Sequence, residues 1–212
     1  MKITDMAETK VLKAGEEALK EALQLLREGK LVAFPTDTVY GVGAHAFLTE
    51  AVERIYTAKL RPKGKAIPLL LSRAEDMELV AQEVPPAAWK LAERFWPGGL
   101  TIVLRKKPIV PDVVSAGGET VALRVPDYPF PLSLIASLGA PLAATSANLA
   151  GHPSPVTAQE VSQELAGRIE LIVDGGPCPG GIPSTVLDLT FDPPAILRHG
   201  AVPEEDILAT LK

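Results

Sequence analysis

The sequence contains few of the residues that cross-link a protein or anchor it to a membrane. Cys178 is the single cysteine among 212 residues, which excludes an internal disulfide framework and a zinc site built from cysteines. Aromatic residues make up only 5%, and no apolar run approaches the roughly 20 residues of a membrane-spanning helix. The start, Met1 to Asp5, is too polar for a signal peptide. We therefore expect a cytoplasmic enzyme or binding protein without a membrane partner.

Positive charge and several common site motifs are also scarce. A net charge of −5 argues against a surface devoted to nucleic acid. Neither GxxxxGK[ST] nor GxGxxG occurs, so no Walker loop or dinucleotide fold is predicted. His45, His152 and His199 lack ligand spacing, so we expect no metal held by protein side chains. A hydrolase triad of Ser184, His199 and Asp188 is disfavoured because the chain has no GxSxG elbow.

Apolar segments of strand length alternate with segments of helical periodicity along the chain. The predicted strands cover residues 31–34, 66–71, 100–104, 120–125, 141–144, 169–173, 184–189 and 195–197. The predicted helices cover 15–29, a stretch from Thr49, 87–95, 131–138, 157–165 and 203–211, and residues 106–118 are predicted to be loop. This alternation predicts an α/β protein, and the successive strands near 184–198 favour a mixed sheet. No linker divides the chain, so we expect one domain over residues 1–212.

The segment from Leu31 to Gly43 is the one around which the chain is organised. An apolar strand is ended by Pro35, and two threonines then flank Asp37 before an aromatic residue and glycines, which let the backbone turn or approach another group closely. Polar residues beyond a strand end are where an α/β sheet presents a ligand site. The plainer alternative is a tight turn in which Asp37 caps N–H groups, and this segment alone does not decide between them.

Basic side chains gather after the predicted second helix. Pro62 and Gly64 oppose a continuing helix, and an extended segment would place Lys59, Arg61, Lys63 and Lys65 on one face. These four cations are either a solvated basic loop or a clamp for phosphate. Elsewhere Arg124 lies inside an apolar predicted strand, where an arginine pairs either with a carboxylate of the fold or with an anionic ligand.

Small polar residues follow a second strand end. Thr145, Ser146 and Asn148 bring hydroxyls and an amide into a predicted loop, groups that suit phosphate oxygens and nucleobase edges. The stretches 72–75 and 157–160 each have the S/T-x-x-E pattern of a capping box, so Ser72 is predicted to have a structural role.

Five motifs together resemble one known family. They are Pro35 to Gly41, Lys59 to Pro62, Thr145 to Asn148, Ser184 to Asp188 and Arg198 to Gly200, in the family's order. The chain resembles the YrdC/Sua5 family, the L-threonylcarbamoyladenylate synthases, over about residues 15–200. The resemblance implies a twisted, open, mixed α/β sheet flanked by helices, with a deep concave ligand cavity. It also implies the short form of the family, without the additional Sua5 C-terminal domain.

The resemblance also implies a reaction and its partners. L-threonine, bicarbonate or CO2, and ATP would give threonylcarbamoyl-AMP and pyrophosphate, with Mg2+ accompanying ATP. This nucleotidyltransferase reaction is the first step of threonylcarbamoyladenosine modification of tRNA. Downstream transferase proteins would then modify tRNA, with which this chain would make at most weak contact. Two alternatives stay open: a non-catalytic RNA-binding module using the same concave basic surface, and a carbamoyl-transfer domain of the hydrogenase-maturation type.

Family roles carry over to the residues that match the motifs. The resemblance assigns L-threonine to Thr38, Arg124, Ala144 and Ser184. It assigns ATP to Lys59, Arg61, Lys65, Thr120, Ser146, Asn148, Ser154 and Arg198, with Lys59 and Arg61 as the catalytic cations. Two features depart from the pattern: Ser72 stands where many members have a histidine, and the spacing from Arg61 to Pro68 is longer than usual.

Overall fold

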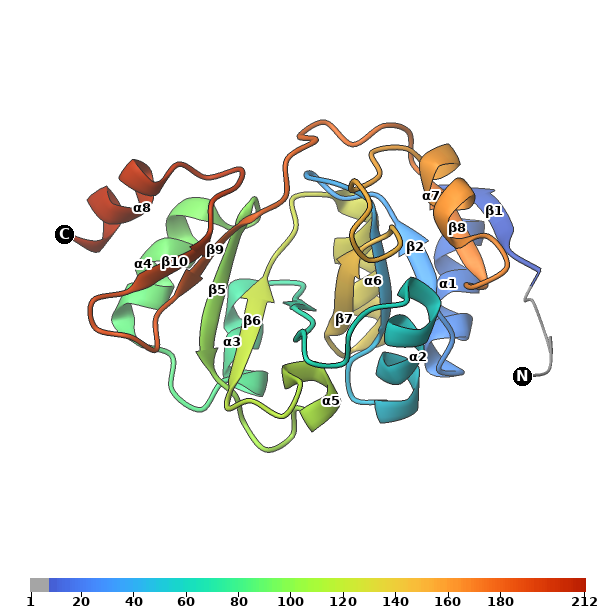
Figure 1. Cartoon of the computed structure of the whole chain (residues 1–212). Helices are drawn as coiled ribbons and strands as arrows, with labels where there is room; N and C mark the ends of the chain where they lie inside the picture. The colour runs from blue at the N-terminus through green and yellow to red at the C-terminus, as the bar shows by residue number, and fades with distance from the viewer. Residues whose placement is uncertain (1–7) are drawn as a thin grey trace.

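The computed structural model describes residues 8–212, and Figure 1 shows its arrangement. Its strands are β1 (Lys10–Lys13), β2 (Val32–Phe34), β3 (Gly41–His45), β4 (Leu69–Leu70), β5 (Leu100–Arg105), β6 (Thr120–Arg124), β7 (Leu142–Ser146), β8 (Leu171–Asp174), β9 (Thr185–Asp188) and β10 (Ala195–Arg198). Its helices are α1 (Glu16–Arg27), α2 (Thr49–Lys59), α3 (Met77–Val80), α4 (Pro86–Phe95), α5 (Asp112–Ser115), α6 (Pro129–Leu138), α7 (Ala158–Leu165) and α8 (Glu204–Leu211), with a 3-10 turn, η1 (Ala74–Asp76).

Within residues 8–212 the strands form one ten-stranded sheet in the order β1-β8-β2-β3-β7-β4-β6-β5-β9-β10. The sheet contains both parallel pairs, such as β5 with β9, and antiparallel pairs, such as β5 with β6. The predicted mixed sheet is therefore confirmed. Neighbouring strands rotate by roughly 20–25°, so the two ends of a sheet this wide face different directions. Figure 1 shows β5, β6, β9 and β10 on one side of the molecule and β1, β2 and β8 on the other.

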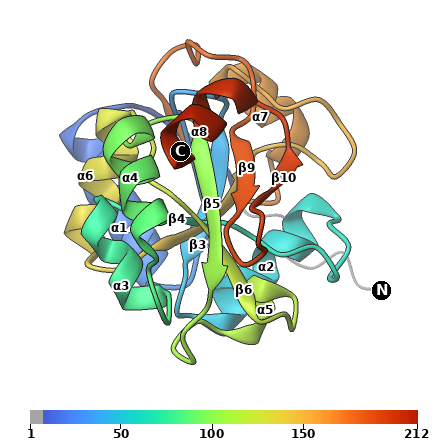
Figure 2. The same cartoon turned by 90° about the vertical axis from the view of Figure 1, so that its left-hand side faces the viewer.

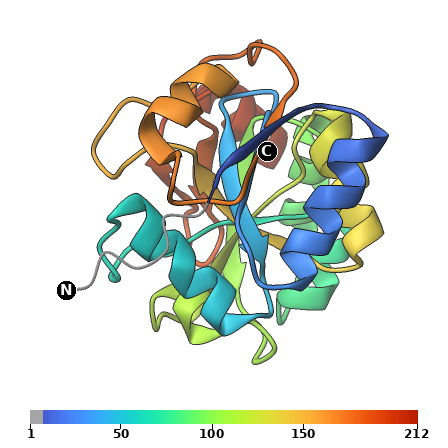
Figure 3. The ribbon, with the colours of Figure 1, turned by 90° about the vertical axis from the view of Figure 1, so that its right-hand side faces the viewer.

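Helices cover the sheet on both sides and bury two apolar clusters. α1, α3, α4 and α6 lie to one side of the central strands in Figure 2, and Figure 3 shows α1 and α6 opposite α2 and α7. One cluster joins α1 and α6 to the β2 and β8 end, with Leu26, Phe34 and Leu134 fully buried. The other joins α2, α3, α4 and α7 to the strands between them. No helix within residues 8–212 is long and apolar enough to cross a membrane.

The structure corrects several local predictions. Residues 41–45 form strand β3, which was not predicted, and of the two uses left open for its glycines the structure shows close approach and not a turn. The predicted strand 66–71 is reduced to Leu69–Leu70, and the predicted loop 106–118 contains α5. The Thr157 capping box is present, but the one predicted at Ser72 is absent: the Ser72 hydroxyl donates to Asp76 Oδ2 at 2.6 Å, beside a 3-10 turn. Ser72 still has a structural role. β1 was not predicted.

The β2–β3 hairpin positions the central motif. β2 pairs antiparallel with β3, with Phe34 opposite Gly41. The Phe34 ring occupies the space above β3, because a Cβ built on Gly43 would lie 3.1 Å from its Cε1 atom. The glycines are therefore needed for close approach within a strand, and residues 35–40 become the loop that joins the two strands.

Candidate functional site

A cavity of about 440 Å³ lies over the middle of the sheet, where most of the motifs meet. It is lined by the hairpin loop, by the end of the segment after α2, and by β4, β5, β6, β7, β9 and β10. The lining residues are Thr36, Thr38, Val39, Tyr40, Gly41, Arg61, Ala66, Pro68, Leu70, Thr101, Val103, Thr120, Ala122, Arg124, Ala144, Thr145, Ser146, Ser154, Pro183, Ser184, Val186, Asp188, Leu197 and Arg198. Segments from Thr36 to Arg198 thus build one site.

Arg124 is buried at one end of this cavity and is held on three sides. Its Nε donates to the Gly98 carbonyl at 2.8 Å, its Nη1 to Thr38 Oγ1 at 2.9 Å, and its Nη2 to Asp37 Oδ1 at 2.5 Å. Burial lowers the pKa of Arg124 and the Asp37 carboxylate opposes that effect, but a guanidinium remains charged at neutral pH. Because a guanidinium has five N–H donors, this fixed cation has donors left for an anionic ligand. Both sequence alternatives for Arg124 are compatible with this geometry.

Ser184 lies close to Arg124 and is held by two polar neighbours. Its Oγ lies 2.7 Å from Thr101 Oγ1, and Arg198 Nη2 donates to that Oγ at 3.0 Å and to the Ser184 carbonyl at 2.8 Å. Gly200 packs against this backbone so closely that an added Cβ would lie 2.6 Å from the Ser184 carbonyl oxygen. The motif from Arg198 to Gly200 therefore positions the motif that begins at Ser184, which explains why both lie near the cavity.

Arg61 supplies the cation at another part of the wall. α2 ends at Lys59, and Leu60 takes the left-handed conformation with φ +53°, so the chain turns sharply. The Arg61 guanidinium donates to the carbonyls of Lys65 (3.2 Å) and Ala66 (2.8 Å) and lines the cavity. The predicted common face of four cations is therefore wrong, because Lys59 is helical and Lys63 and Lys65 are exposed outside the cavity.

Lys59 lies behind the cavity wall rather than in it. Its ammonium donates to the carbonyls of Ser146 and Asn148, and its side chain is among the largest that are fully buried. Burial, with a smaller contribution from Arg61, lowers the pKa of Lys59 to about 7. In this conformation the lysine holds the 146–148 backbone and does not face the cavity.

The loop after β7 is fixed by further contacts. Asn148 Nδ2 donates to the carbonyls of Leu149 (2.8 Å) and His152 (2.7 Å), while its Oδ1 is buried without a partner in the described part of the chain. Glu164 on α7 accepts from the Leu149 N–H at 2.9 Å and lies 2.9 Å from His152 Nδ1. Lys59 and Glu164 thus hold this loop from two sides, which places Ser146 and Ser154 at the cavity.

The structure brings most of the residues named by the resemblance to this cavity. Those that line it are Thr38, Arg61, Thr120, Arg124, Ala144, Ser146, Ser154, Ser184 and Arg198. Lys59, Lys65 and Asn148 do not line it. The sequence reasoning did not assign Thr36, Thr101 or Asp188 to the site, although all three line the cavity. Strand alternation could have found Asp188, because it lies two residues after Val186 and four after Ser184.

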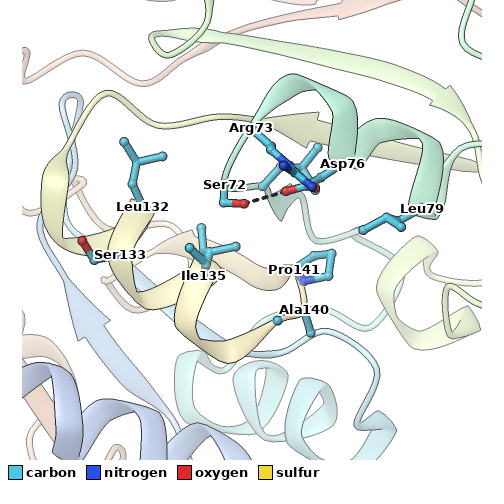
Figure 4. A pocket seen from close by; sticks show the side chains of 12 residues that line it. Ser72, Arg73, Asp76, Leu79, Leu132, Ser133, Ile135, Ala140 and Pro141 are labelled. Carbon is cyan, nitrogen blue, oxygen red and sulfur yellow. Dashed lines mark hydrogen bonds and ion pairs between the residues drawn. The ribbon is translucent and has the colours of Figure 1, made fainter.

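A second cavity, of about 660 Å³, lies between the η1–α3 segment and α6 (Figure 4). Its polar groups satisfy one another: Ser72 donates to Asp76, and Arg73 pairs with the same carboxylate at 3.1 Å. The rest of its lining is largely apolar, with Leu132 and Ile135 from α6. Although this cavity is larger, its lining contains no residue of the five motifs, so we assign the candidate site to the cavity with Arg61, Arg124 and Arg198. Ser72 belongs to the second cavity and not to the candidate site.

Within residues 8–212 no three His, Cys, Asp or Glu side chains come together in a way that could hold a metal ion. Apart from Asp188, the polar side chains that line the candidate site carry guanidinium groups and hydroxyls, which suit anionic ligands. The fold and site therefore define an α/β protein with a central cavity for anionic ligands.

Comparisons with known proteins give the family. The model Sua5_yciO_yrdC, described as telomere recombination, matches residues 24–200, and the chain belongs to this family. The threonylcarbamoyl-AMP synthase of Pyrococcus abyssi is 47% identical over 91% of this chain and 56% of that relative. The threonylcarbamoyl-AMP synthase of Bacillus subtilis is 46% identical over 96% of this chain and 59% of that relative. The chain thus spans less than two thirds of the length of these two relatives.

A solved structure confirms the fold. The crystal structure of Pyrococcus abyssi Sua5 complexed with L-threonine superposes with a TM-score of 0.92 and 44% sequence identity. The match covers 96% of this chain and 60% of that one. The expected family and the twisted α/β fold are confirmed by these comparisons.

Proposed function

We propose that this chain is a threonylcarbamoyl-AMP synthase. It would join L-threonine, bicarbonate or CO2, and ATP into threonylcarbamoyl-AMP, with release of pyrophosphate. Two relatives of that name, each at least 46% identical, support the proposal. The structural observation that carries it is a single cavity with one buried, oriented guanidinium, Arg124, and a second guanidinium, Arg61, on another wall.

The amino acid would bind at the Arg124 end. A carboxylate takes the unused N–H donors of the guanidinium, since charge-assisted arginine–carboxylate contacts are strong and directional. The hydroxyls of Thr38 and Ser184 would form hydrogen bonds with the threonine hydroxyl. Thr38 Oγ1 lies 2.9 Å from Arg124 Nη1, and Ser184 Oγ lies 3.0 Å from Arg198 Nη2. Asp37 balances the arginine charge from the other side, so the threonine carboxylate enters a site that is oriented before it binds.

The triphosphate would meet Arg61, Arg198 and the hydroxyls of Ser146 and Ser154. The threonine amine and bicarbonate first form a carbamate with loss of water. A carbamate oxygen then attacks the α-phosphorus of ATP, and the bond to the β-phosphate oxygen breaks to release pyrophosphate. No protein nucleophile is required. The chain contributes positioning of two anions and neutralisation of charge on the phosphoryl oxygens.

Mg2+ would enter with ATP as part of the substrate. Mg2+ keeps several waters and binds substrate phosphates with few protein carboxylates, which is consistent with a cavity lined by cations and hydroxyls. We further propose that the product is passed to transferase proteins that modify tRNA, and that the chain acts in the cytoplasm, where these partners are found.

One assay tests the proposed function. Pyrophosphate release from ATP and Mg2+ is measured with both L-threonine and bicarbonate, and with each omitted in turn. We expect release only when both are present, together with a product whose mass is that of threonylcarbamoyl-AMP. Release that is independent of threonine, or no release from protein that binds ATP, contradicts the proposal.

A further inference from the structure

Asp188 is the one acidic side chain among the described residues that line the candidate-site cavity, which is also lined by three arginines. It is buried, with 5% of its surface exposed. A carboxylate is unfavourable next to bound phosphates and favourable next to a ligand group that donates a hydrogen bond. This inference rests on the proposed function, because it concerns which part of ATP that group is.

The strand register places Asp188 far from the amino-acid end. Asp188 is the last residue of β9, and Ser184 directly precedes that strand. Four residues of extended chain separate the two by about 13 Å. β9 is also two strands from β6, which carries Arg124, and two strand spacings are about 10 Å. Asp188 is therefore at the end of the cavity where the part of ATP most distant from the threonine would lie.

The space beside Asp188 is flat and apolar. Asp188 pairs with Val103 on β5, and Val103 pairs with Ala122 on β6, so these three side chains form one row across the sheet. Pro68, one residue before β4, also lines the cavity. Small apolar side chains in a row leave room for a planar ring.

Leu197 provides apolar surface at the cavity opening. The register of β10 shifts between Ile196 and Arg198, which places Leu197 at a β-bulge. Its side chain is 58% exposed and also lines the cavity. Bulges next to binding sites redirect a side chain, and Leu197 is placed to pack on a ring bound in the cavity.

One oxygen of Asp188 is already used and the other is left for a ligand. Oδ1 accepts from the Thr190 N–H at 2.8 Å and from Thr190 Oγ1 at 2.6 Å, and no hydrogen bond to Oδ2 forms within residues 8–212. We propose that Asp188 Oδ2 accepts a hydrogen bond from the 6-amino group of adenine, whose ring lies on the Val103–Ala122 row under Leu197. Asp188 is then the residue that selects adenine among nucleobases.

Inosine triphosphate is the matched probe, because it carries a carbonyl oxygen where ATP has the amino group. Binding of Mg2+ complexes of ATP, inosine triphosphate and 2′-deoxyATP to the full chain is measured by calorimetry. A hydrogen bond to a charged acceptor corresponds to about tenfold or more in affinity, so we expect the unaltered protein to prefer ATP over inosine triphosphate by at least that factor. Equal affinity for the two nucleotides overturns the proposal without any variant.

Asp188→Asn separates base selection from a structural role, because its Oδ1 still accepts from Thr190. We expect this variant to lose affinity for ATP and to gain affinity for inosine triphosphate, so that their ratio approaches one. The proposal is overturned if Asp188→Asn lowers the affinity for ATP and for inosine triphosphate by the same factor. It is also overturned if the variant changes the preference between ATP and 2′-deoxyATP and not that between ATP and inosine triphosphate. Leu197→Ser should reduce the affinity for ATP and for inosine triphosphate by the same factor. If the unaltered protein binds no ATP, the proposed function fails as well; tight ATP binding without base selection removes only this inference.

Discussion

At the scale of single residues, the site depends on which cations are free and which are already engaged. Arg124 is anchored by Asp37, Thr38 and Gly98, whereas Arg61 bonds to two backbone carbonyls and to no other group within residues 8–212. Lys59 is turned to backbone oxygens behind the cavity wall. Three cations that look alike in a sequence therefore have different environments, and each gives a different expectation.

Arg61→Ala should reduce kcat/KM for ATP. Removing one partner of a desolvated charge pair costs on the order of 2–5 kcal/mol, which corresponds to roughly 30-fold or more. Steady-state pyrophosphate release measures the effect, and circular dichroism shows whether the fold is intact. Lys90→Ala, an exposed cation on α4 away from the cavity, is the control and should leave the rate unchanged. A folded Arg61 variant with near-normal kcat/KM would remove Arg61 from the mechanism.

Lys59→Met should change how stability depends on pH. The pKa of Lys59 is about 7 in the fold and about 10.4 in an unfolded chain, so between these values the unfolded chain binds more protons. The buried Lys59 ammonium therefore lowers the free energy of unfolding most strongly below pH 7. As the pH rises above 7, the free energy of unfolding increases by on the order of 1 kcal/mol per pH unit. Urea unfolding at pH 7, 8 and 9 should therefore show the unaltered protein gaining stability relative to the variant. If the free energies of unfolding of the two proteins differ by the same amount at all three pH values, the two carbonyls keep the Lys59 ammonium protonated.

Amino-acid choice tests the roles of Thr38 and Ser184. Loss of the threonine methyl costs roughly 10- to 200-fold in kcat/KM, so serine should be a weak substrate. Valine keeps the shape but leaves the hydroxyl partners unpaired, and discrimination can reach about 10⁴. Amino-acid-dependent pyrophosphate release should therefore decrease in the order threonine, serine, valine. Better activity with valine than with serine would show that the site does not recognise the hydroxyl.

At the scale of elements, the β2–β3 hairpin decides where the central motif points. Phe34 on β2 lies against Gly41 and Gly43 on β3, at distances that leave no room for a side chain. The hairpin is also joined to β7, since Gly43 pairs with Ala144. The loop with Asp37 and Thr38 is thereby held over the cavity from both of its ends.

Gly43→Ala should destabilise the protein by about 1–3 kcal/mol, the usual cost of adding a group to a filled core. The new Cβ would lie 3.1 Å from Phe34 Cε1 and 3.4 Å from the Ala143 carbonyl oxygen. Chemical denaturation measures the change. Gly64→Ala is the matched control, because nothing lies within 4 Å of its Cβ position. Equal stability of the two variants would show that the Phe34 contact is not tight.

At the scale of the whole molecule, the cavity joins segments that are distant in the sequence. The hairpin loop, the turn after α2, the loop after β7 and the β9–β10 pair all contribute to it. A ligand that bridges these segments binds the folded chain and not the unfolded one. It should therefore stabilise the whole fold by mass action.

ATP with Mg2+ should raise the thermal unfolding midpoint. At 100 times Kd the stabilisation is about 2.7 kcal/mol, which corresponds to roughly 5–10 °C for a chain of this size. Differential scanning fluorimetry over a range of ATP concentrations measures the shift, and Arg61→Ala should reduce it. No shift at millimolar ATP would mean that the cavity does not bind the nucleotide in this chain.

The sequence by itself determined the helices with apolar stripes, most of the strands, the mixed sheet and the family, because periodicity and ordered motifs are local signals. It did not predict β3, because glycines after a strand end suit either a turn or a close approach, and only the position of the Phe34 ring shows that close approach applies. It placed Lys59 beside Arg61 on one face, whereas the helix end and the left-handed Leu60 separate them. It also left Asp188 unassigned. Its neighbours Val103 and Ala122 come from other strands, and only tertiary pairing places them side by side.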